Sequence, residues 1–151
     1  MKKLSIGVLF ISGFLFAGSS FANVTDLSCD FKNGGDMLVT HDDESIYIAY
    51  SDPKLSPDDN VIILGKSSEN VEQVVIPATQ YAEFSLSGIT DQNIMVYISY
   101  IPKNLDGIPV ADFSLINDKG KITQAGKCIV GTIKTRNNLL EEGISGVRVR
   151  K

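Results

Sequence analysis

Residues 94–101 constrain the fold more than any other stretch, because they favour a β-strand along their whole length. The stretch is rich in β-branched and aromatic side chains and contains no charge, glycine or proline. Side chains on a strand alternate between two faces, and here neither face is clearly polar. We therefore expect a central strand that has neighbours on both sides and is at least partly covered on both faces.

Short strand-like runs and turn signals fill the rest of the chain. Turns are indicated by Asn33-Gly34-Gly35 and by residues 117–120, because Asn and Gly tolerate the backbone angles of tight turns. The other predicted strands lie at 27–31, 37–40, 45–51, 61–64, 71–76, 80–86, 110–116, 121–123 and 128–134, and residues 144–149 could form a last one. About nine or ten short strands at this spacing predict an all-β fold, an antiparallel β-sandwich or a flattened barrel. Residues 135–142 are the one predicted short helix, which would end at Gly143.

The first 22 residues have the pattern of a secretory signal peptide. Lys2 and Lys3 precede an uncharged apolar run, and Ser20-Phe21-Ala22 places small residues where a signal peptidase reads. The apolar run is shorter than the roughly 20 residues that a membrane-spanning helix needs. We therefore expect cleavage after Ala22, a single domain over residues 23–151, and a bacterial protein that is periplasmic or secreted.

The charge of the mature chain disfavours two classes of partner. Without Lys2 and Lys3, the 14 Lys and Arg residues become 12 against 18 Asp and Glu, a net charge of −6. Binding to nucleic acid is driven by neutralising phosphates, so an acidic chain is a poor candidate for it. Anionic lipid surfaces are disfavoured for the same reason, and no second apolar run is long enough to span a membrane.

The two cysteines, Cys29 and Cys128, lie near opposite ends of the mature domain. In an oxidising compartment such a pair predicts one disulfide that ties an early strand to a late one. Two thiols alone are a poor metal site, and the sequence predicts no metal and no cofactor.

No catalytic residue is assigned from the sequence. The one histidine, His41, precedes the acidic residues 42–44, where we expect a solvated hairpin turn with an exposed histidine. A Ser-His-Asp triad at this place would need a distant serine, and no nucleophile-elbow, P-loop or dinucleotide-binding motif is present. A carboxylate pair that uses Glu83 or Asp43 is the alternative, and it would make the chain a small hydrolase.

Acidic loops offer a further alternative, which is calcium binding. Asp42, Asp43 and Glu44 form one group of hard oxygen ligands, and Asp52 with residues 58–60 forms another. Neither group has the spacing of an EF-hand loop, and acidic turns are commonly just solvated.

Apolar side chains on outward-facing positions give the main functional signal. Tyr47 lies on the outer side of its predicted strand, and Met95, Tyr97 and Ile101 share one side of the central strand. If the two strands are neighbours, these four residues form a patch of the type enriched at protein interfaces. The alternative is that a second sheet or the 135–142 segment covers them, which would make them core residues.

The chain ends in a basic tail at residues 147–151, which predicts either an edge strand protected by its charges or a segment that adds to a partner's sheet.

The sequence as a whole favours a non-enzymatic exported binding protein that acts on another protein, as an inhibitor, an immunity-like protein or an accessory factor for a surface structure. A structural subunit of such an assembly and a small hydrolase are the two alternatives.

Overall fold

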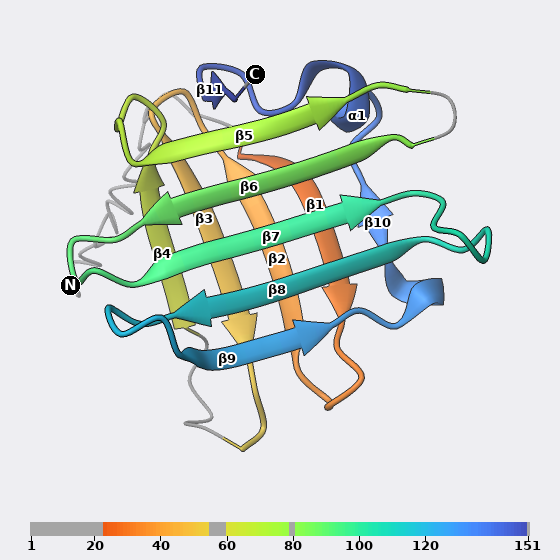
Figure 1. The fold of residues 1–151 in the computed structure, drawn as a ribbon, viewed down its shortest axis with the longest axis horizontal. Coiled ribbons are helices and arrows are strands. Elements are labelled where there is room, and N and C mark those ends of the chain that lie inside the picture. Colours follow the sequence, from red (N-terminus) through yellow and green to blue (C-terminus); the bar gives the residue numbers. More distant parts are fainter. Residues whose placement is uncertain (1–22, 55–59, 79–80, 151) are drawn as a thin grey trace, which may run out of the picture.

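The computed structural model describes residues 23–54, 60–78 and 81–150 and places them in two facing β-sheets (Figure 1). Strands of one sheet run across those of the other, and the inner faces of both sheets form one core. The all-β sandwich predicted from the sequence is confirmed. The predicted signal peptide, residues 1–22, lies outside the described residues.

Five strands form the first sheet, which contains both the start and a late part of the chain. Its order in space is β10 (Lys134–Thr135), β1 (Val24–Asp30), β2 (Asp36–His41), β3 (Ser45–Ser51) and β4 (Asn60–Gly65), all antiparallel. The chain then crosses to the second sheet and does not return until β10.

Six strands form the second sheet. Its order is β11 (Arg148–Val149), β5 (Val71–Ile76), β6 (Glu83–Ile89), β7 (Met95–Ile101), β8 (Val110–Ile116) and β9 (Ile122–Lys127). Only the β11–β5 pair is parallel. Strand β7 lies between β6 and β8, as its uncharged sequence predicts. Each sheet is therefore a simple meander of consecutive strands completed by one short piece of the C-terminal segment.

Alternation along the strands builds the core. In β3, Ile46, Ile48 and Tyr50 are buried, and in β7 the buried residues are Val96, Ile98 and Tyr100. The ring of Phe113 from β8 packs against both Tyr50 and Phe31, with centroid distances of 5.0 and 5.9 Å. These contacts join the two sheets, because Tyr50 belongs to the first sheet and Phe113 to the second.

A disulfide between Cys29 and Cys128 closes one side of the sandwich, as predicted. Cys29 lies in β1 of the first sheet and Cys128 directly follows β9 of the second. The backbone also pairs here, since the N–H of Ile129 donates to the carbonyl of Asp30 at 2.8 Å. The two sheets are thus bound covalently and by hydrogen bonds along the same side.

The C-terminal segment differs from its prediction. Residues 128–134 are not a strand: Cys128 makes an isolated bridge to Phe31, and a 3₁₀ turn (Val130–Thr132) follows. The pairing ends because Thr132 turns back and its Oγ1 accepts a hydrogen bond from the N–H of Asp30 at 2.9 Å. The predicted helix is one turn, α1 (Leu139–Glu142), and ends before Gly143 as expected. Of residues 144–149 only β11 is a strand.

Gln73 holds the C-terminal segment against the open end of the sandwich. Its buried amide donates to the carbonyls of Ile144 and Val147, at 2.8 and 3.0 Å, and its Oε1 accepts from the N–H of Ile144 at 2.8 Å. The side chains of Leu139, Ile144 and Val147 are buried beside it. Within the described residues, no helix has the length and apolar character that crossing a bilayer requires.

Candidate protein-binding surface

The four residues predicted to form one patch lie on two different sheets. Tyr47 belongs to β3 in the five-stranded sheet, whereas Met95, Tyr97 and Ile101 belong to β7 in the six-stranded sheet. Each points outward from its own sheet, so the predicted single face does not form. The prediction of one patch required β3 and β7 to be neighbours, and they are not.

Tyr47 is held in place by the turn between β2 and β3. Its hydroxyl donates to a carboxylate oxygen of Asp42 at 2.7 Å. This hydrogen bond lowers the pKa of Asp42, and the backbone N–H groups of Glu44 and Ser45 lower it further. The same hydrogen bond raises the pKa of Tyr47, since the hydroxyl must keep its proton to donate.

The outer face of the six-stranded sheet is open. Met95 and Tyr97 are 39% and 37% exposed, so neither a second sheet nor the 135–142 segment covers them. Tyr97 has Ser87 and Ser114 as its cross-strand partners, which makes its surroundings small and polar. Met95 lies in a row of apolar residues that crosses four strands, because Ile89 and Ile116 oppose it and Ile122 opposes Ile116. This face is therefore a mixed surface with apolar side chains at one end.

The outer face of the five-stranded sheet also carries exposed apolar side chains. Leu38, Val61 and Ile63 are 41%, 56% and 60% exposed. The strand register aligns Leu38, Ala49 and Val61 in one row across β2, β3 and β4, and places Ile63 beside Tyr47 in the next row. We call Leu38, Ala49, Val61 and Ile63 the outer aliphatic strip.

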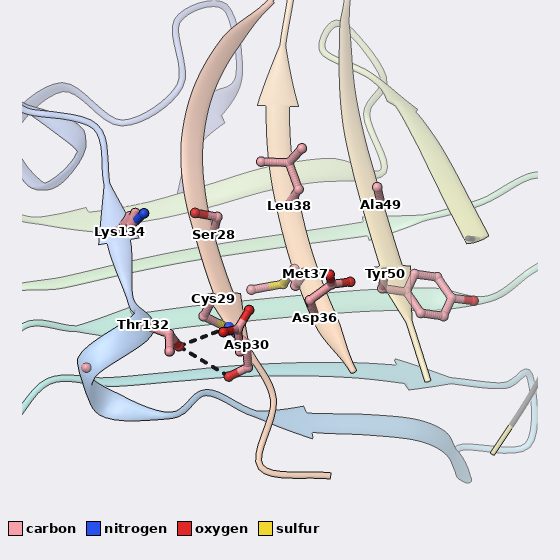
Figure 2. Close-up of a pocket in the computed structure, with 11 residues that line it drawn as sticks. Ser28, Cys29, Asp30, Asp36, Met37, Leu38, Ala49, Tyr50, Thr132 and Lys134 are labelled. Carbon is pink, nitrogen blue, oxygen red and sulfur yellow. Dashed lines mark hydrogen bonds between the residues drawn. The ribbon is translucent and has the colours of Figure 1, made fainter. Parts of the chain in front are cut away.

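Beside this strip lies a trough of about 480 Å³ (Figure 2). Its floor is the outer face of β1, β2 and β3, and its wall is the segment that contains the 3₁₀ turn and β10. Its lining residues are Ser28, Cys29, Asp30, Asp36, Met37, Leu38, Ala49, Tyr50, Gly131, Thr132 and Lys134. Leu38 and Ala49 belong to both features, so the strip and the trough form one surface.

Two carboxylates face each other in the trough. Asp30 and Asp36 are directly opposed across β1 and β2, and both are exposed. Like charges at opposed positions destabilise an antiparallel pair. One oxygen of Asp36 accepts a hydrogen bond from Ser51 at 2.5 Å, and Lys134 lies on the far wall. The trough therefore offers a negative end next to aliphatic surface.

A second polar cluster lies at the other end of the sheet, and its centre is Asp26. A β-bulge between Thr25 and Leu27 turns Asp26 inward, where it is fully buried. Its two carboxylate oxygens contact Nε of Arg136 at 2.9 Å and Nδ1 of His41 at 2.5 Å. The prediction that His41 lies in an exposed turn is wrong, because this contact holds its ring in the interior at the end of β2.

The cluster borders a recess of about 200 Å³ that His41, Arg136 and Ser145 share. An Asp-His pair beside a serine contains the residue types of a catalytic triad. Among the hydrogen bonds of the described residues, however, none joins Ser145 to His41, and Arg136 already compensates the charge of Asp26. The observed contacts tie β1 and β2 to the C-terminal segment.

Lys66 is a further charged group near this cluster and is buried. Burial lowers its pKa, and the carboxylates of Asp43, Asp26 and Asp42 act in the opposite direction. Its backbone N–H donates to the carbonyl of Glu44 at 2.9 Å. Lys66 therefore belongs to the structural network at this end of the sandwich.

The acids considered for catalysis or calcium binding are not gathered into one site. Glu83 lies in β6 and Asp43 in the turn after β2, on different sheets. The described residues contain no group of three or more His, Cys, Asp or Glu side chains that could hold a metal ion. Asp58 and Asp59, proposed as calcium ligands, lie outside the described residues.

No protein family model, curated protein or solved structure shows significant similarity to this chain. The fold defines its class as a two-sheet β-sandwich closed by one disulfide.

Proposed function

We propose that this chain is an exported, non-enzymatic binding protein that contacts another protein through the outer face of its five-stranded sheet. The observation that supports this is the outer aliphatic strip, which exposes Leu38, Val61 and Ile63 next to the trough. Contiguous exposed apolar surface beside polar groups is typical of protein interfaces. An inhibitor, an immunity-like protein or an accessory factor would use such a surface.

Charge indicates the chemistry of the partner. Asp30 and Asp36 repel each other, and a Lys or Arg side chain of a partner that enters the trough would relieve this repulsion. The mature chain has a net charge of −6, which also attracts a basic protein over longer distances. A basic partner that presents an aliphatic or aromatic side chain next to a cationic one fits the strip and the trough together.

The disulfide supports export. Bonds of this kind persist in oxidising compartments such as the periplasm or the exterior of the cell, and are rare in the cytosol of mesophiles. Together with the signal-like residues 1–22, this favours a periplasmic or secreted protein.

A capture experiment with matched variants tests the proposal. The wild-type mature protein is immobilised, exposed to periplasmic and secreted extract, and compared with Leu38→Lys and Ile122→Lys. Both variants replace an exposed aliphatic residue, but Ile122 lies in β9 of the other sheet. We expect one basic protein to bind to the wild type and to Ile122→Lys, and to be lost with Leu38→Lys.

The role of the carboxylates is tested on the captured partner. The double variant Asp30→Asn, Asp36→Asn should bind more weakly, and its affinity should depend less on salt than that of the wild type. Equal retention of the partner by Leu38→Lys and by the wild type would refute the proposed surface.

The hydrolase alternative rests on one observation, which is that His41, paired with Asp26, borders the same recess as Ser145. A panel of ester, peptide and glycan substrates tests it. Turnover that Ser145→Ala or His41→Ala abolishes, while both variants remain folded, would favour an enzyme over a binding protein. Turnover lost on substitution of Glu83 or Asp43 would instead favour the carboxylate mechanism.

A further inference from the structure

Serine side chains surround one aromatic ring on the outer face of the six-stranded sheet, where β6, β7 and β8 lie side by side (Figure 1). Ser87 of β6 and Ser114 of β8 directly oppose Tyr97, and Ser99 is the next outward residue of β7. Neighbouring strands are about 4.8 Å apart, and outward residues of one strand about 6.7 Å apart. Because its neighbours are small, the side chain of Tyr97 remains 37% exposed. We call Tyr97, Ser87, Ser99 and Ser114 the Tyr97 platform.

The hydroxyl groups of the Tyr97 platform are not engaged within the described part of the chain. Elsewhere, the hydroxyls of Ser51 and Thr132 donate to neighbouring oxygens, but no hydrogen bond between described residues uses a hydroxyl of the platform. Asp112 opposes Ser99 on the same face, and its Oδ1 is buried without a hydrogen-bond partner among these residues. Buried acceptors are normally paired, so the hydrogen-bonding capacity of this carboxyl group is not fully used.

The stability of the sheet does not account for these serines. Strand positions favour β-branched and aromatic side chains, and valine or threonine at positions 87, 99 and 114 would pair more favourably with Tyr97 and its neighbours. Serine gives up this gain and leaves room above the strands beside the ring. The platform therefore combines an accessible aromatic ring with free hydroxyl groups.

We propose that the Tyr97 platform binds an uncharged carbohydrate chain. Serine is depleted at protein interfaces, and free hydroxyl groups are costly to bury against a lipid tail, so these two ligand classes fit poorly. The net charge of −6 disfavours nucleic acid and repels acidic polysaccharides. A neutral sugar fits, because its hydroxyls can exchange hydrogen bonds with serine while its C–H groups stack on the ring of Tyr97.

The surroundings of Tyr97 match the two-sided chemistry of a sugar ring. Along β7, the apolar Met95 lies on one side of Tyr97 and Ser99 on the other. A sugar above Tyr97 would place C–H groups toward Met95 and hydroxyls toward Ser99. A chain that runs across β6, β7 and β8 would follow the row of Ser87, Tyr97 and Ser114. This site lies on the six-stranded sheet, so the proposal goes beyond the proposed function, which uses the other sheet.

Co-sedimentation of the oxidised mature protein with insoluble cellulose, chitin and starch tests the proposal. We expect the wild type to bind at least one of them independently of salt, and a soluble oligosaccharide of the same sugar to release it. Tyr97→Thr removes the ring but keeps a residue that favours strands, and should raise the dissociation constant by about tenfold or more. Tyr97→Phe keeps the ring and should bind within about threefold of the wild type. Tyr81→Thr is the matched control and should bind normally, since Tyr81 is 69% exposed and precedes β6.

Several outcomes would overturn the proposal. A wild type that binds none of the three polysaccharides would do so, as would full binding by Tyr97→Thr or equal loss in Tyr81→Thr or Tyr97→Phe. Binding that disappears at high salt would show ionic contacts and refute an uncharged ligand. If Tyr97→Thr does not fold, Ser114→Val replaces it and should weaken binding, because it removes a hydroxyl and adds bulk beside the ring. Leu38→Lys should bind the polysaccharide normally while losing the protein partner, which separates this inference from the proposed function.

Discussion

Replacing Gln73 by methionine tests how the C-terminal segment is held. Methionine has a similar volume and flexibility but cannot form the three hydrogen bonds that Gln73 makes with Ile144 and Val147. The variant removes the side-chain partner of one N–H and two carbonyl groups in a buried place, and of these the Ile144 carbonyl keeps the N–H of Val147 at 3.4 Å.

The expected cost follows from these three contacts. A neutral hydrogen bond contributes about 0.5–1.5 kcal/mol net, and a buried group left without a partner costs about 1–3 kcal/mol. The net contributions of the three hydrogen bonds add up to about 1.5–4.5 kcal/mol. We expect Gln73→Met to lower the free energy of unfolding by about 3 kcal/mol, and the melting temperature by about 10 °C for a domain of this size.

Urea unfolding followed by circular dichroism measures this loss, and hydrogen exchange shows where it occurs. Amides of residues 139–149 should exchange faster in Gln73→Met, whereas those of β7 should change only through the lower global stability. Gln124→Met is the control, because within the described residues the Gln124 side chain makes one hydrogen bond, to Asp52 at 3.2 Å, and its loss should cost below about 1 kcal/mol. A loss below about 1 kcal/mol for Gln73→Met, with an unchanged urea dependence, would refute the reasoning.

Three further predictions concern other interactions and buried groups that affect the stability of the fold. Replacing Cys29 and Cys128 together by alanine should lower the free energy of unfolding in urea by about 2–5 kcal/mol; an unchanged urea midpoint would contradict this. Asp26→Asn should cost about 3 kcal/mol in the same assay, because the part-buried Arg136 side chain loses its counter-charge; a stabilised variant would show that the ion pair is dispensable. Burial lowers the pKa of Lys66 in the folded protein. Between this lowered pKa and 10.5, the ordinary value, the unfolded chain binds more protons than the folded one, so the free energy of unfolding rises with pH. Lys66→Met should lack this rise, and an identical pH profile in the two proteins would contradict it.

The elements that could be predicted from the sequence are those whose side chains follow one clear pattern along the strand. Strand β7 is free of charge over its length and lies inside its sheet, and the alternation in β3 correctly separates Ile46, Ile48 and Tyr50 from Tyr47. The disulfide followed from the number and placement of the cysteines. In these cases local composition and tertiary structure favour the same arrangement.

Features that depend on long-range contacts could not be predicted. Residues 61–64 are all aliphatic, so no polar residue marks the outer face. Strand β4 is an edge strand whose sequence is typical of a buried strand. Asp26 was assigned no role from the sequence, and the bulge turns it inward to meet Arg136, which lies 110 residues later. His41 is buried for the same reason, and nothing near it in the sequence indicates its partner.

The disulfide limits the ways in which this chain can misfold. The two cysteines are 99 residues apart and come from different sheets, so their thiols meet only after both ends of the domain have been brought together. A chain with two cysteines has no wrong pairing within one molecule, and a disulfide isomerase has nothing to correct there. The only erroneous product is a covalent link between two molecules, which a gel run without reductant separates from every non-covalent species.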